Sequence, residues 1–334
     1  MPSPLVLVIT SEQDTHVHVV GELLSERGID WVRLNTDDLF RNTRMTLHPT
    51  TATGQITILD SGLTVDLEAV SAVWYRKPET PSTSHMRASG GHSERFLEAE
   101  AYEALLGLYA MLQDKPWINN PLTTRYAHRR FRQLHVARRI GFLTARSVFA
   151  NDPDEVLAFA ESVDGPLALK SLGALAVTDP VEGNVAHQYG VLTRTIDRDT
   201  LGELRASIEN MPTFLQEYVD KRYDLRVVVA GRHVFACRIH SQSGELTRHD
   251  FRIQTKNLHH ETIELEPELR ALMGRYLDEM GLNFGCFDFV EDADGTPYFL
   301  ECNPNGQWLW VEKKTGAPIA AAIADLLADL AGAA

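Results

Sequence analysis

Three oxygen-bearing side chains stand in two apolar segments near the C-terminal end of the chain. Asp288 lies in the middle of FGCFDFV, and Glu301 and Asn303 are two positions apart in YFLECNPNG. Because side chains alternate along a strand, Glu301 and Asn303 would lie on one face of a hairpin, with Asp288 beside them. Buried like charges repel each other, so such a cluster usually holds a cation. Oxygen ligands without His or Cys favour Mg²⁺ or Mn²⁺, with places left for water and phosphate oxygens.

The alternative is that Asp288 and Glu301 are solvated charges at the edge of a sheet. Their strongly apolar surroundings favour the metal site over this alternative. Lys170, which ends the apolar run PLALK, has the same two interpretations. By itself it would be a solvated residue at a strand end, whereas next to a metal site it would neutralise phosphate charge.

A possible nucleotide contact lies in FLQEYVDKRYDLR, residues 214–226, which reads as an apolar strand leading into a polar hinge. The backbone N–H and C=O groups of such a hinge would suit the edge of a purine. Asp220 or Asp224 would then reach ribose hydroxyls or an ordered cation. The spacing of these residues does not establish this role alone.

The elements that must position these residues follow from the hydrophobic pattern. A β-α-β unit opens the chain, with an apolar strand at 4–10, a helix that ends at Gly28 and a strand at 29–34. Its first turn, TSEQD, lacks the glycines of a GxGxxG motif, which argues against a dinucleotide site. Further strands are predicted at 54–60, 63–67, 70–76, 144–149, 166–171, 191–196, 213–219, 225–230, 233–240, 283–290 and 296–302. Further helices are predicted at 94–112, 124–140, 153–162, 199–209, 267–280 and 317–331.

This order of elements predicts an α/β fold, in part α+β, with three units. Asn119-Asn120-Pro121 and Met211-Pro212 are the expected breaks between them. The units would be an N-terminal β-α-β domain at 1–118, a central α/β subdomain at 119–211 and a C-terminal subdomain at 212–334. The last of these would contain a mixed or antiparallel sheet and the metal site.

Composition and charge narrow the class of protein. The chain has 334 residues, of which 44% are hydrophobic and 23% charged, and its formal net charge is −14. Such a charge argues against nucleic-acid binding and against docking on an anionic membrane. No apolar run approaches the length of a membrane span, and the N-terminus has no basic region typical of a signal peptide. The three cysteines form no CxxC pair, so a reducing cytoplasm is the expected compartment.

The candidate residues, taken in order, resemble the ATP-grasp superfamily of carboxylate–amine ligases. That resemblance rests on Lys170, QEYV (216–219), Asp224-Leu225-Arg226, Arg238, Asp288 and Glu301-Cys302-Asn303-Pro304. More narrowly, the chain resembles the graspetide (microviridin-type) macrocyclases, which are ATP-grasp maturases of ribosomally made peptides. This narrower resemblance rests on VWYRKP (73–78), RIHSQ (238–242), TRHDFR (247–252) and NPNGQW (303–308).

The resemblance implies an ATP-grasp fold, in which 1–118 is a pre-ATP-grasp domain. It implies an ADP-forming ligase that uses ATP with Mg²⁺ or Mn²⁺. Such enzymes activate Asp or Glu side chains of a precursor peptide as acyl phosphates, then join them to Ser, Thr or Lys in ester, amide or imide rings. The partner would be a precursor with a leader and an acidic core, and a homodimer is expected because related enzymes are commonly dimers.

The resemblance also implies roles for individual residues. Lys170 and Arg238 would contact phosphates, and Arg226 would lie near the phosphates or the acyl group. Asp250 and Arg252 would contact the acidic acceptor side chain. The adenine pocket would be lined by Gln216, Glu217, Tyr218 and Val219, with Asp224 in the same nucleotide site. The metals would be held by Asp288, Glu301 and Asn303.

Two features depart from the family pattern. The first ATP-binding lysine of the family is replaced here by Arg130, which keeps the charge and can hold phosphate with two N–H groups. The alternative for this Arg-rich stretch is a solvated helix face. The loop after Lys170, SLGALAVTD, is poor in glycine.

The polar stretch 241–262 is either a flap or added-strand surface for a leader peptide, or an ordinary hairpin excursion.

Two other functions stay open. One is a small-molecule or glutamate-adding ligase of the same superfamily, and the other is a non-catalytic scaffold that binds ATP. The HSQ and DxR stretches favour the peptide substrate. An acyl phosphate needs no protein nucleophile, which agrees with the lack of a GxSxG motif or a convincing Cys/His pair.

Overall fold

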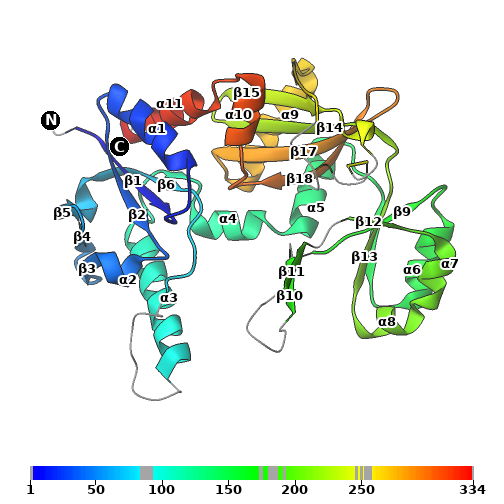
Figure 1. Ribbon diagram of the computed structural model, residues 1–334, viewed down its shortest axis with the longest axis horizontal. Helices are drawn as coiled ribbons and strands as arrows, with labels where there is room; N and C mark the ends of the chain where they lie inside the picture. The colour runs from blue at the N-terminus through cyan, green and yellow to red at the C-terminus, as the bar shows by residue number, and fades with distance from the viewer. Residues whose placement is uncertain are drawn as a thin grey trace.

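A computed structural model describes residues 3–82, 93–172, 176–179, 187–190, 193–244, 247–248, 251 and 258–332. The strands of these residues form five sheets. Figure 1 shows an N-terminal parallel sheet on the left, a five-stranded sheet at the top and a smaller four-stranded sheet at the lower right. The last two sheets contain the predicted nucleotide and metal residues.

A parallel sheet in the order β2-β1-β6-β7 forms the centre of the N-terminal part. Its strands are β1 (Leu5–Thr10), β2 (Asp30–Asn35), β6 (Val70–Tyr75) and β7 (Trp117–Ile118). β1 is almost wholly buried because helices or strands cover both of its faces, as its continuous apolar sequence predicts. The neighbouring helices are α1 (His16–Glu26), α3 (Ser93–Met111) and α11 (Ile319–Gly332).

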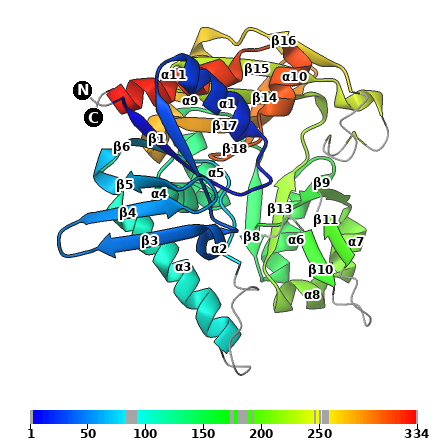
Figure 2. The same ribbon diagram turned by 60° about the vertical axis from the view of Figure 1, so that its left-hand side comes forward.

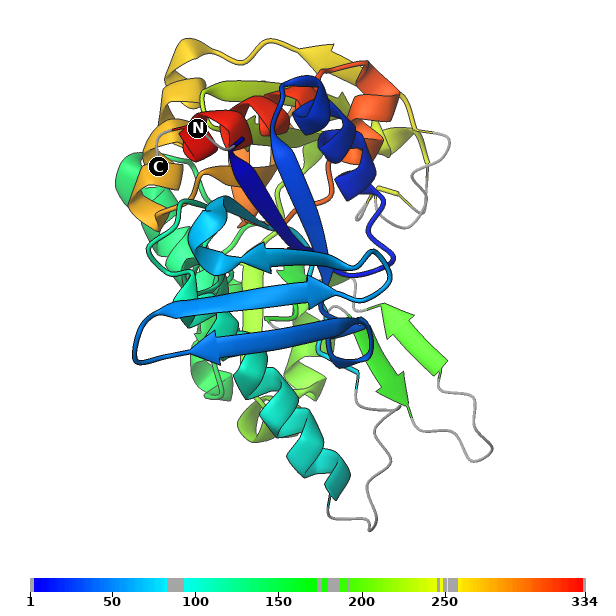
Figure 3. The same cartoon turned by 90° about the vertical axis from the view of Figure 1, so that its left-hand side faces the viewer.

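The predicted β-α-β opening is confirmed in detail. Val17, Val20 and Leu24 form the buried stripe of α1, and Gly28, with φ of 71°, ends that helix region as predicted. α1 packs against α11, from the far end of the chain, and Figure 3 shows the two helices above the N-terminal strands. The C-terminal helix therefore belongs to the packing of the N-terminal sheet as well.

A small antiparallel sheet flanks this domain. It consists of β3 (Thr43–His48), β4 (Thr53–Ile58) and β5 (Leu63–Asp66), with the short helices α2 (Leu39–Asn42) and η1 (Leu67–Ala69) beside it. The two strands predicted at 54–60 and 63–67 are present as β4 and β5, and they pair as an antiparallel hairpin. The strand β3 was not predicted, because its sequence TRMTLH is largely polar. In the structure it pairs with β4 in an antiparallel arrangement.

The central part is an antiparallel sheet in the order β12-β9-β13-β8, packed against short helices. Its strands are β8 (Ser147–Ala150), β9 (Leu167–Leu169), β12 (Arg194–Ile196) and β13 (Thr213–Glu217). Its helices are α6 (Pro153–Glu161), α7 (Arg198–Glu203) and α8 (Arg205–Asn210), and a separate hairpin is formed by β10 (Ala176–Asp179) and β11 (His187–Gly190). Asp152 caps α6, since its side chain accepts a hydrogen bond from the N–H of Asp154.

The helix predicted at 124–140 is wrong, because the chain forms two helices there. They are α4 (Pro121–Ala127) and α5 (Arg130–Ile140). Arg129 between them has an extended backbone with ψ of 112°, which interrupts the helical hydrogen bonds and places Arg130 at the start of α5. The helix predicted at 199–209 is divided in the same way at Leu204.

The C-terminal sheet is antiparallel, in the order β16-β15-β14-β17-β18. Its strands are β14 (Lys221–Ala230), β15 (His233–Ile239), β16 (His260–Ile263), β17 (Phe284–Asp292) and β18 (Pro297–Asn303). The associated helices are η2 (Ser241–Ser243), α9 (Pro267–Met280) and α10 (Leu309–Thr315). Neither β16 nor α10 was predicted.

Two separate cores cover the two faces of this sheet. Leu225, Phe287 and Phe289 pack with α5 and α9 on one face. Val228, Cys237 and the other residues of the opposite face share a core with α1, α10 and α11, which join the sheet to the N-terminal domain (Figure 2). The metal residues lie on this second face, between the domains. The domain boundaries at 118/119 and 211/212 stay predictions.

Candidate active site

The predicted metal residues meet on the β17–β18 hairpin. Asp288 lies directly opposite Glu301, and Asn303 lies opposite Cys286 in the same antiparallel pair. Directly opposed side chains of antiparallel strands point to the same face, so the structure brings Asp288, Glu301 and Asn303 together. All three side chains are partly exposed, while Phe287 and Cys302 are buried on the other face.

Each carboxylate of the hairpin is already oriented toward a positive charge. Nη1 of Arg226 donates to both carboxylate oxygens of Asp288, at 2.9 and 2.8 Å. Nη2 of Arg130, at the start of α5, donates to Oε2 of Glu301 at 3.0 Å. Burial acts to lower the pKa of Arg226, but the charge of Asp288 outweighs it, so the pKa is raised and the guanidinium stays charged. Arg130 therefore lies in the site, as the resemblance implies, and contacts Glu301.

The donor set fits a hard divalent cation. Asp288, Glu301 and Asn303 offer only oxygen atoms, which suit Mg²⁺ or Mn²⁺. Within the described ranges, no group of three or more His, Cys, Asp or Glu side chains is arranged for a metal. A metal would therefore be held by two carboxylates together with the amide oxygen of Asn303, and it would supply charge to offset phosphate oxygens.

The backbone of the hairpin is held in place by residues from other elements. Gln133 of α5 donates to the carbonyl of Cys302 at 2.7 Å and accepts from its N–H at 3.1 Å. This pair of hydrogen bonds fixes the strand between Glu301 and Asn303. A Cβ atom on Gly306 would lie 2.6 Å from Sγ of Cys286, so only glycine allows the following loop to approach β17 this closely.

The predicted nucleotide residues form a second group in the central sheet. Nζ of Lys170, just after β9, donates to Oε1 of the buried Gln216 at 2.6 Å. Gln216 and Glu217 end β13, and Tyr218 and Val219 lead from there into β14. This segment is thus the covalent link between the central and C-terminal sheets, which is where the sequence predicts a hinge.

Asp224 forms an ion pair that the sequence did not predict. Both of its carboxylate oxygens accept hydrogen bonds from Nζ of Lys221, at 2.8 and 2.7 Å, and both side chains are buried. A buried ion pair of this kind holds the start of β14 beside the hinge. The structure therefore gives Asp224 a structural partner in the residues next to the predicted adenine pocket.

Arg238 lies on the other face of the sheet from the metal residues. It is opposite Leu225 in the β14–β15 pair, whereas Asp288 is opposite Arg226 in the β14–β17 pair. Neighbouring residues of a strand point to opposite faces, so Arg238 is separated from Asp288 by the sheet itself. Its guanidinium donates to Glu291 at 3.1 Å and packs over the ring of Tyr223. The structure does not bring Arg238 to the metal site.

Asp250 and Arg252, predicted to contact the acceptor side chain, lie outside the described residues, as do residues 245–246, 249 and 253–257 of the predicted flap. The cysteines offer no alternative nucleophile. Cys237, Cys286 and Cys302 are free and buried, and burial raises the pKa of the Cys286 thiol to about 11.

A cavity of about 290 Å³ opens beside the loop that follows the metal strand. Asn305 of that loop lines one side, and residues of α3 and α4 line the others. Two of the lining residues, Tyr109 and Thr124, have buried hydroxyl groups without a hydrogen-bond partner in the described part of the chain. Both residues are more than nine-tenths buried.

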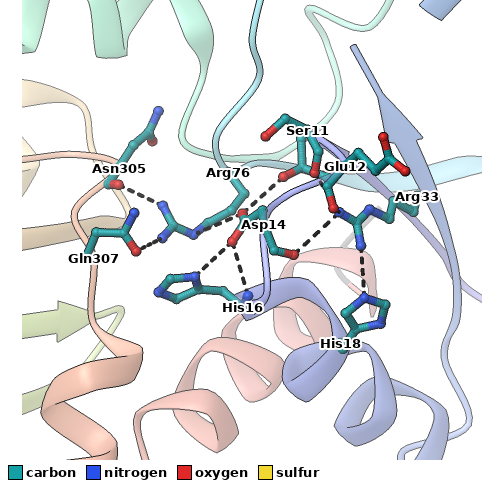
Figure 4. Close-up of polar contacts among 10 residues, drawn as sticks. Ser11, Glu12, Asp14, His16, His18, Arg33, Arg76, Asn305 and Gln307 are labelled. Atoms are coloured by element: carbon teal, nitrogen blue, oxygen red, sulfur yellow. Dashed lines mark hydrogen bonds and ion pairs between the residues drawn. The ribbon is translucent and has the colours of Figure 1, made fainter. Parts of the chain in front are cut away.

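A buried polar cluster next to this site was missed by sequence reasoning. Asp14 follows β1 and Arg76 follows β6, and these strands are parallel neighbours whose carboxyl ends meet. Nε of Arg76 lies 3.6 Å from Oδ2 of Asp14, and both side chains are almost fully buried. Figure 4 shows this pair with His16, whose Nδ1 lies 2.8 Å from the other carboxylate oxygen. The signal that points to such a cluster is a charged residue shortly after each of two buried strands, four positions after β1 and one position after β6.

The cluster predicts a pH dependence of stability. Burial lowers the pKa of His16 below its ordinary 6.5, against the opposing effect of Asp14, so the folded chain favours the neutral ring. Below about pH 6.5 the unfolded chain binds the proton more tightly, and stability falls as the pH drops toward the folded pKa.

We expect the melting temperature of the wild type to fall more steeply from about pH 7.5 to about pH 5.5 than that of His16→Gln. Differential scanning calorimetry at matched ionic strength measures both slopes. The other histidines are shared by the two proteins, so their titration cancels in the difference. Equal slopes would contradict a buried neutral His16.

Comparison with family models assigns both halves of the chain. Residues 5–125 match the MvdD pre-ATP grasp domain, and residues 127–327 match the RimK-like ATP-grasp domain. The chain belongs to the RimK-like ATP-grasp family. The predicted ATP-grasp fold, with a pre-ATP-grasp domain before it, is confirmed, and the chain is placed among the ATP-grasp ligases. A search of curated proteins found no significant match.

Solved ATP-grasp structures superpose on nearly the whole chain. A Chryseobacterium gregarium RiPP-associated ATP-grasp ligase, in complex with ADP and a leader and core peptide, has a TM-score of 0.87 and 24% identity over 98% of this chain and 97% of that one. The macrocyclase MdnC from Microcystis aeruginosa MRC, bound with precursor peptide MdnA, has a TM-score of 0.82 and 25% identity over 97% and 99%. The ligase PsnB, complexed with a minimal precursor variant, Mg and ADP, has a TM-score of 0.76 and 21% identity over 99% of each chain.

No helix among the described residues combines the length and apolar composition required to cross a bilayer.

Proposed function

We propose that this ATP-grasp protein activates Asp or Glu side chains of a ribosomally made precursor peptide and crosslinks them within that peptide. The observation that carries the proposal is the β17–β18 hairpin, where two carboxylates and an amide oxygen lie together and face Arg226 and Arg130. The fold agrees, since the similar structures include ligases complexed with precursor peptides, ADP and Mg. ATP and Mg²⁺, with Mn²⁺ as a substitute, are therefore the proposed substrate and metal.

The chemistry explains why positive charge is concentrated in the site. A carboxylate is a poor electrophile because its oxygen leaves badly, whereas transfer of the γ-phosphoryl group gives an acyl phosphate and ADP. A hydroxyl or amine of the same peptide then attacks the acyl carbon, and inorganic phosphate leaves. The protein supplies position and charge rather than a nucleophile. Bound Mg²⁺ would neutralise phosphate oxygens, and Arg130 and Arg226 would add to that charge.

The remaining site residues receive roles that follow from their positions. Lys170 would contact phosphates from the central sheet, and Gln216 to Val219 would line the adenine pocket at the hinge. Asp224 would support that pocket through its ion pair with Lys221. Arg238, on the opposite face, would act only indirectly, and Asp250 and Arg252 stay candidates for the acceptor side chain.

The direct test is to incubate the protein with ATP, Mg²⁺ and candidate precursor peptides and then weigh the peptide. Loss of one water mass for each bond formed, together with ADP release, supports the crosslinking reaction. Turnover with free amino acids but no peptide would instead indicate a small-molecule ligase. Nucleotide binding without turnover on any peptide would indicate a scaffold.

The cavity beside Asn305 is the proposed place for the peptide segment next to the reacting carboxylate. Leu106 of α3 lines the cavity and is only partly buried, so a larger side chain there fills the space without disrupting the core. We expect Leu106→Trp to raise the KM for the peptide by about tenfold, since each 1.4 kcal/mol of lost binding is a factor of ten. The KM for ATP should stay unchanged.

Leu106→Ala is the matched control, because it enlarges the cavity at the same position. Steady-state kinetics with peptide and ATP varied in turn measure both KM values. An unchanged peptide KM in Leu106→Trp, with the melting temperature preserved, would place the peptide elsewhere.

A further inference from the structure

The loop after the metal strand is held by arginines from two different domains. Nη1 of Arg76, from the pre-ATP-grasp domain, donates to the carbonyl of Asn305 at 2.7 Å. Nη2 of Arg226, from the C-terminal sheet, donates to the carbonyl of Gln307 at 2.8 Å, while its Nη1 holds Asp288. The loop from Pro304 to Gln307 therefore lies between a guanidinium of each domain.

Further contacts tie this loop to its surroundings. The side-chain N–H₂ of Asn119 donates to the carbonyls of Pro304 and Phe284, both at 2.9 Å. The N–H of Asn305 donates to Oδ1 of Asn303 at 3.0 Å, so the position of the loop also sets the orientation of a predicted metal ligand. A shift of the loop would move Asn303 directly and Asp288 through Arg226.

Arg76 is held in its own domain by the buried cluster of Figure 4. Asp14 accepts hydrogen bonds from the Thr10 hydroxyl at 3.0 Å and from the N–H of His16 at 3.1 Å. Burial acts to raise the pKa of Asp14, but the His16 hydrogen bonds and the charge of Arg76 outweigh it, so its pKa is lowered and the carboxylate stays charged. Arg33 donates to the carbonyls of Ser11, Glu12 and Asp14, which fixes the turn that bears the carboxylate.

We propose that Arg76, held by Asp14, is a positioning residue through which the pre-ATP-grasp domain sets the geometry of the metal site. This proposal rests on the proposed function for the identity of that site. Two buried charges are retained here although burial of an ion pair adds little net stability. The planar guanidinium serves a purpose that an apolar side chain does not, since it bridges Asp14 to a backbone carbonyl of the other domain. The cluster thus joins the domains at the site rather than merely at their common core.

The test compares metal binding in Arg76→Met and Asp14→Asn with the wild type. Titration of Mn²⁺ in the presence of ADP and without peptide, followed by electron paramagnetic resonance, reports the metal site directly. We expect the Kd for Mn²⁺ to rise by about tenfold or more in both variants, as is usual when an outer partner of a metal ligand is lost. Arg76→Lys keeps the charge but loses the fork, so it should restore only part of the affinity.

Arg27→Met is the matched control. Arg27 of α1 forms an ion pair with Asp325 of α11 at 2.7 Å, which joins the same two regions of the chain away from the metal strand. We expect Arg27→Met to lower the melting temperature as a structural contact would, with the Kd for Mn²⁺ unchanged. A double-mutant cycle should show that Asp14→Asn and Arg76→Met are not additive in Mn²⁺ affinity.

An unchanged Kd for Mn²⁺ in folded Asp14→Asn and Arg76→Lys would overturn the proposal, and so would an equal rise in Arg27→Met. Asp14→Asn keeps the shape of the side chain, so it stays informative where Arg76→Met fails to fold. The proposed function fails separately. If the wild type binds Mn²⁺ and ADP but crosslinks no peptide, the proposed peptide reaction is wrong. The positioning role of Arg76 is then still tested by the Kd values for Mn²⁺.

Discussion

Glu301→Gln is expected to lower kcat by about 10²- to 10³-fold, the loss typical when one charge-stabilising group is removed from an active site. Glutamine keeps the size of the side chain and can still accept a hydrogen bond from Arg130. What it removes is the negative charge that would bind the divalent cation beside Asp288. The fold should be preserved because the side chain is about one-third exposed, at 31%. Single-turnover assays with peptide and ATP measure the loss.

Glu291→Gln is the matched control for that prediction. Glu291 lies on β17, the other strand of the same hairpin, but pairs with Arg238 on the opposite face of the sheet. We expect its kcat to stay within about threefold of the wild type, which is a far smaller change than the loss expected for Glu301→Gln. Retained crosslinking in Glu301→Gln would show that the metal assignment is wrong. Equal losses in both variants would show that the two faces do not separate the roles.

Arg130→Ala is expected to raise the KM for ATP by about 10- to 100-fold. A hydrogen bond to a charged group contributes about 1.5–3 kcal/mol, and each 1.4 kcal/mol corresponds to a factor of ten. Arg130 begins α5 and reaches Glu301, so its guanidinium stands where phosphate oxygens would meet the metal. Isothermal titration with ADP and Mg²⁺, together with steady-state kinetics, measures the effect.

Arg129→Ala provides the control, because Arg129 is the exposed residue directly before α5. It removes the same charge from the same segment, so a general electrostatic effect would appear in both variants. Arg130→Lys should recover part of the affinity. An unchanged nucleotide affinity in Arg130→Ala would return this residue to the solvated helix face that the sequence left open.

The metal hairpin shows how far the sequence reaches into the site. The alternation of FGCFDFV and YFLECNPNG was enough to predict two paired strands with Asp288, Glu301 and Asn303 on one face, as the structure has them. The same alternation does not predict which residues of another strand share a face of the sheet with the hairpin residues. The face on which Arg238 lies depends on how β15 pairs with β14, and that register is set by the packing of the whole sheet.

The division of the predicted helix at 124–140 has a comparable cause. Helical periodicity in the sequence runs through Arg129, whereas in the structure α4 ends at Ala127 and α5, which packs against α9 and β18, begins at Arg130. This division is what places Arg130 at the start of α5, close to Glu301. A local pattern therefore predicted the element, while tertiary contacts decided where its functional residue points.

The sequence by itself determined the class of fold, the family and the hairpin of oxygen ligands, because each of these depends on residue types and their spacing within short segments. Only the tertiary structure decided that Arg76, which is held by Asp14 and lies more than two hundred residues from Asn305, contacts the loop after β18. Such contacts depend on which domains pack together, and hydrophobic periodicity within a segment carries no information about that. For the same reason, the motif was enough to place Arg226 near the site. Its hydrogen bond to the carbonyl of Gln307 could not be predicted, because it depends on how the loop packs against the sheet.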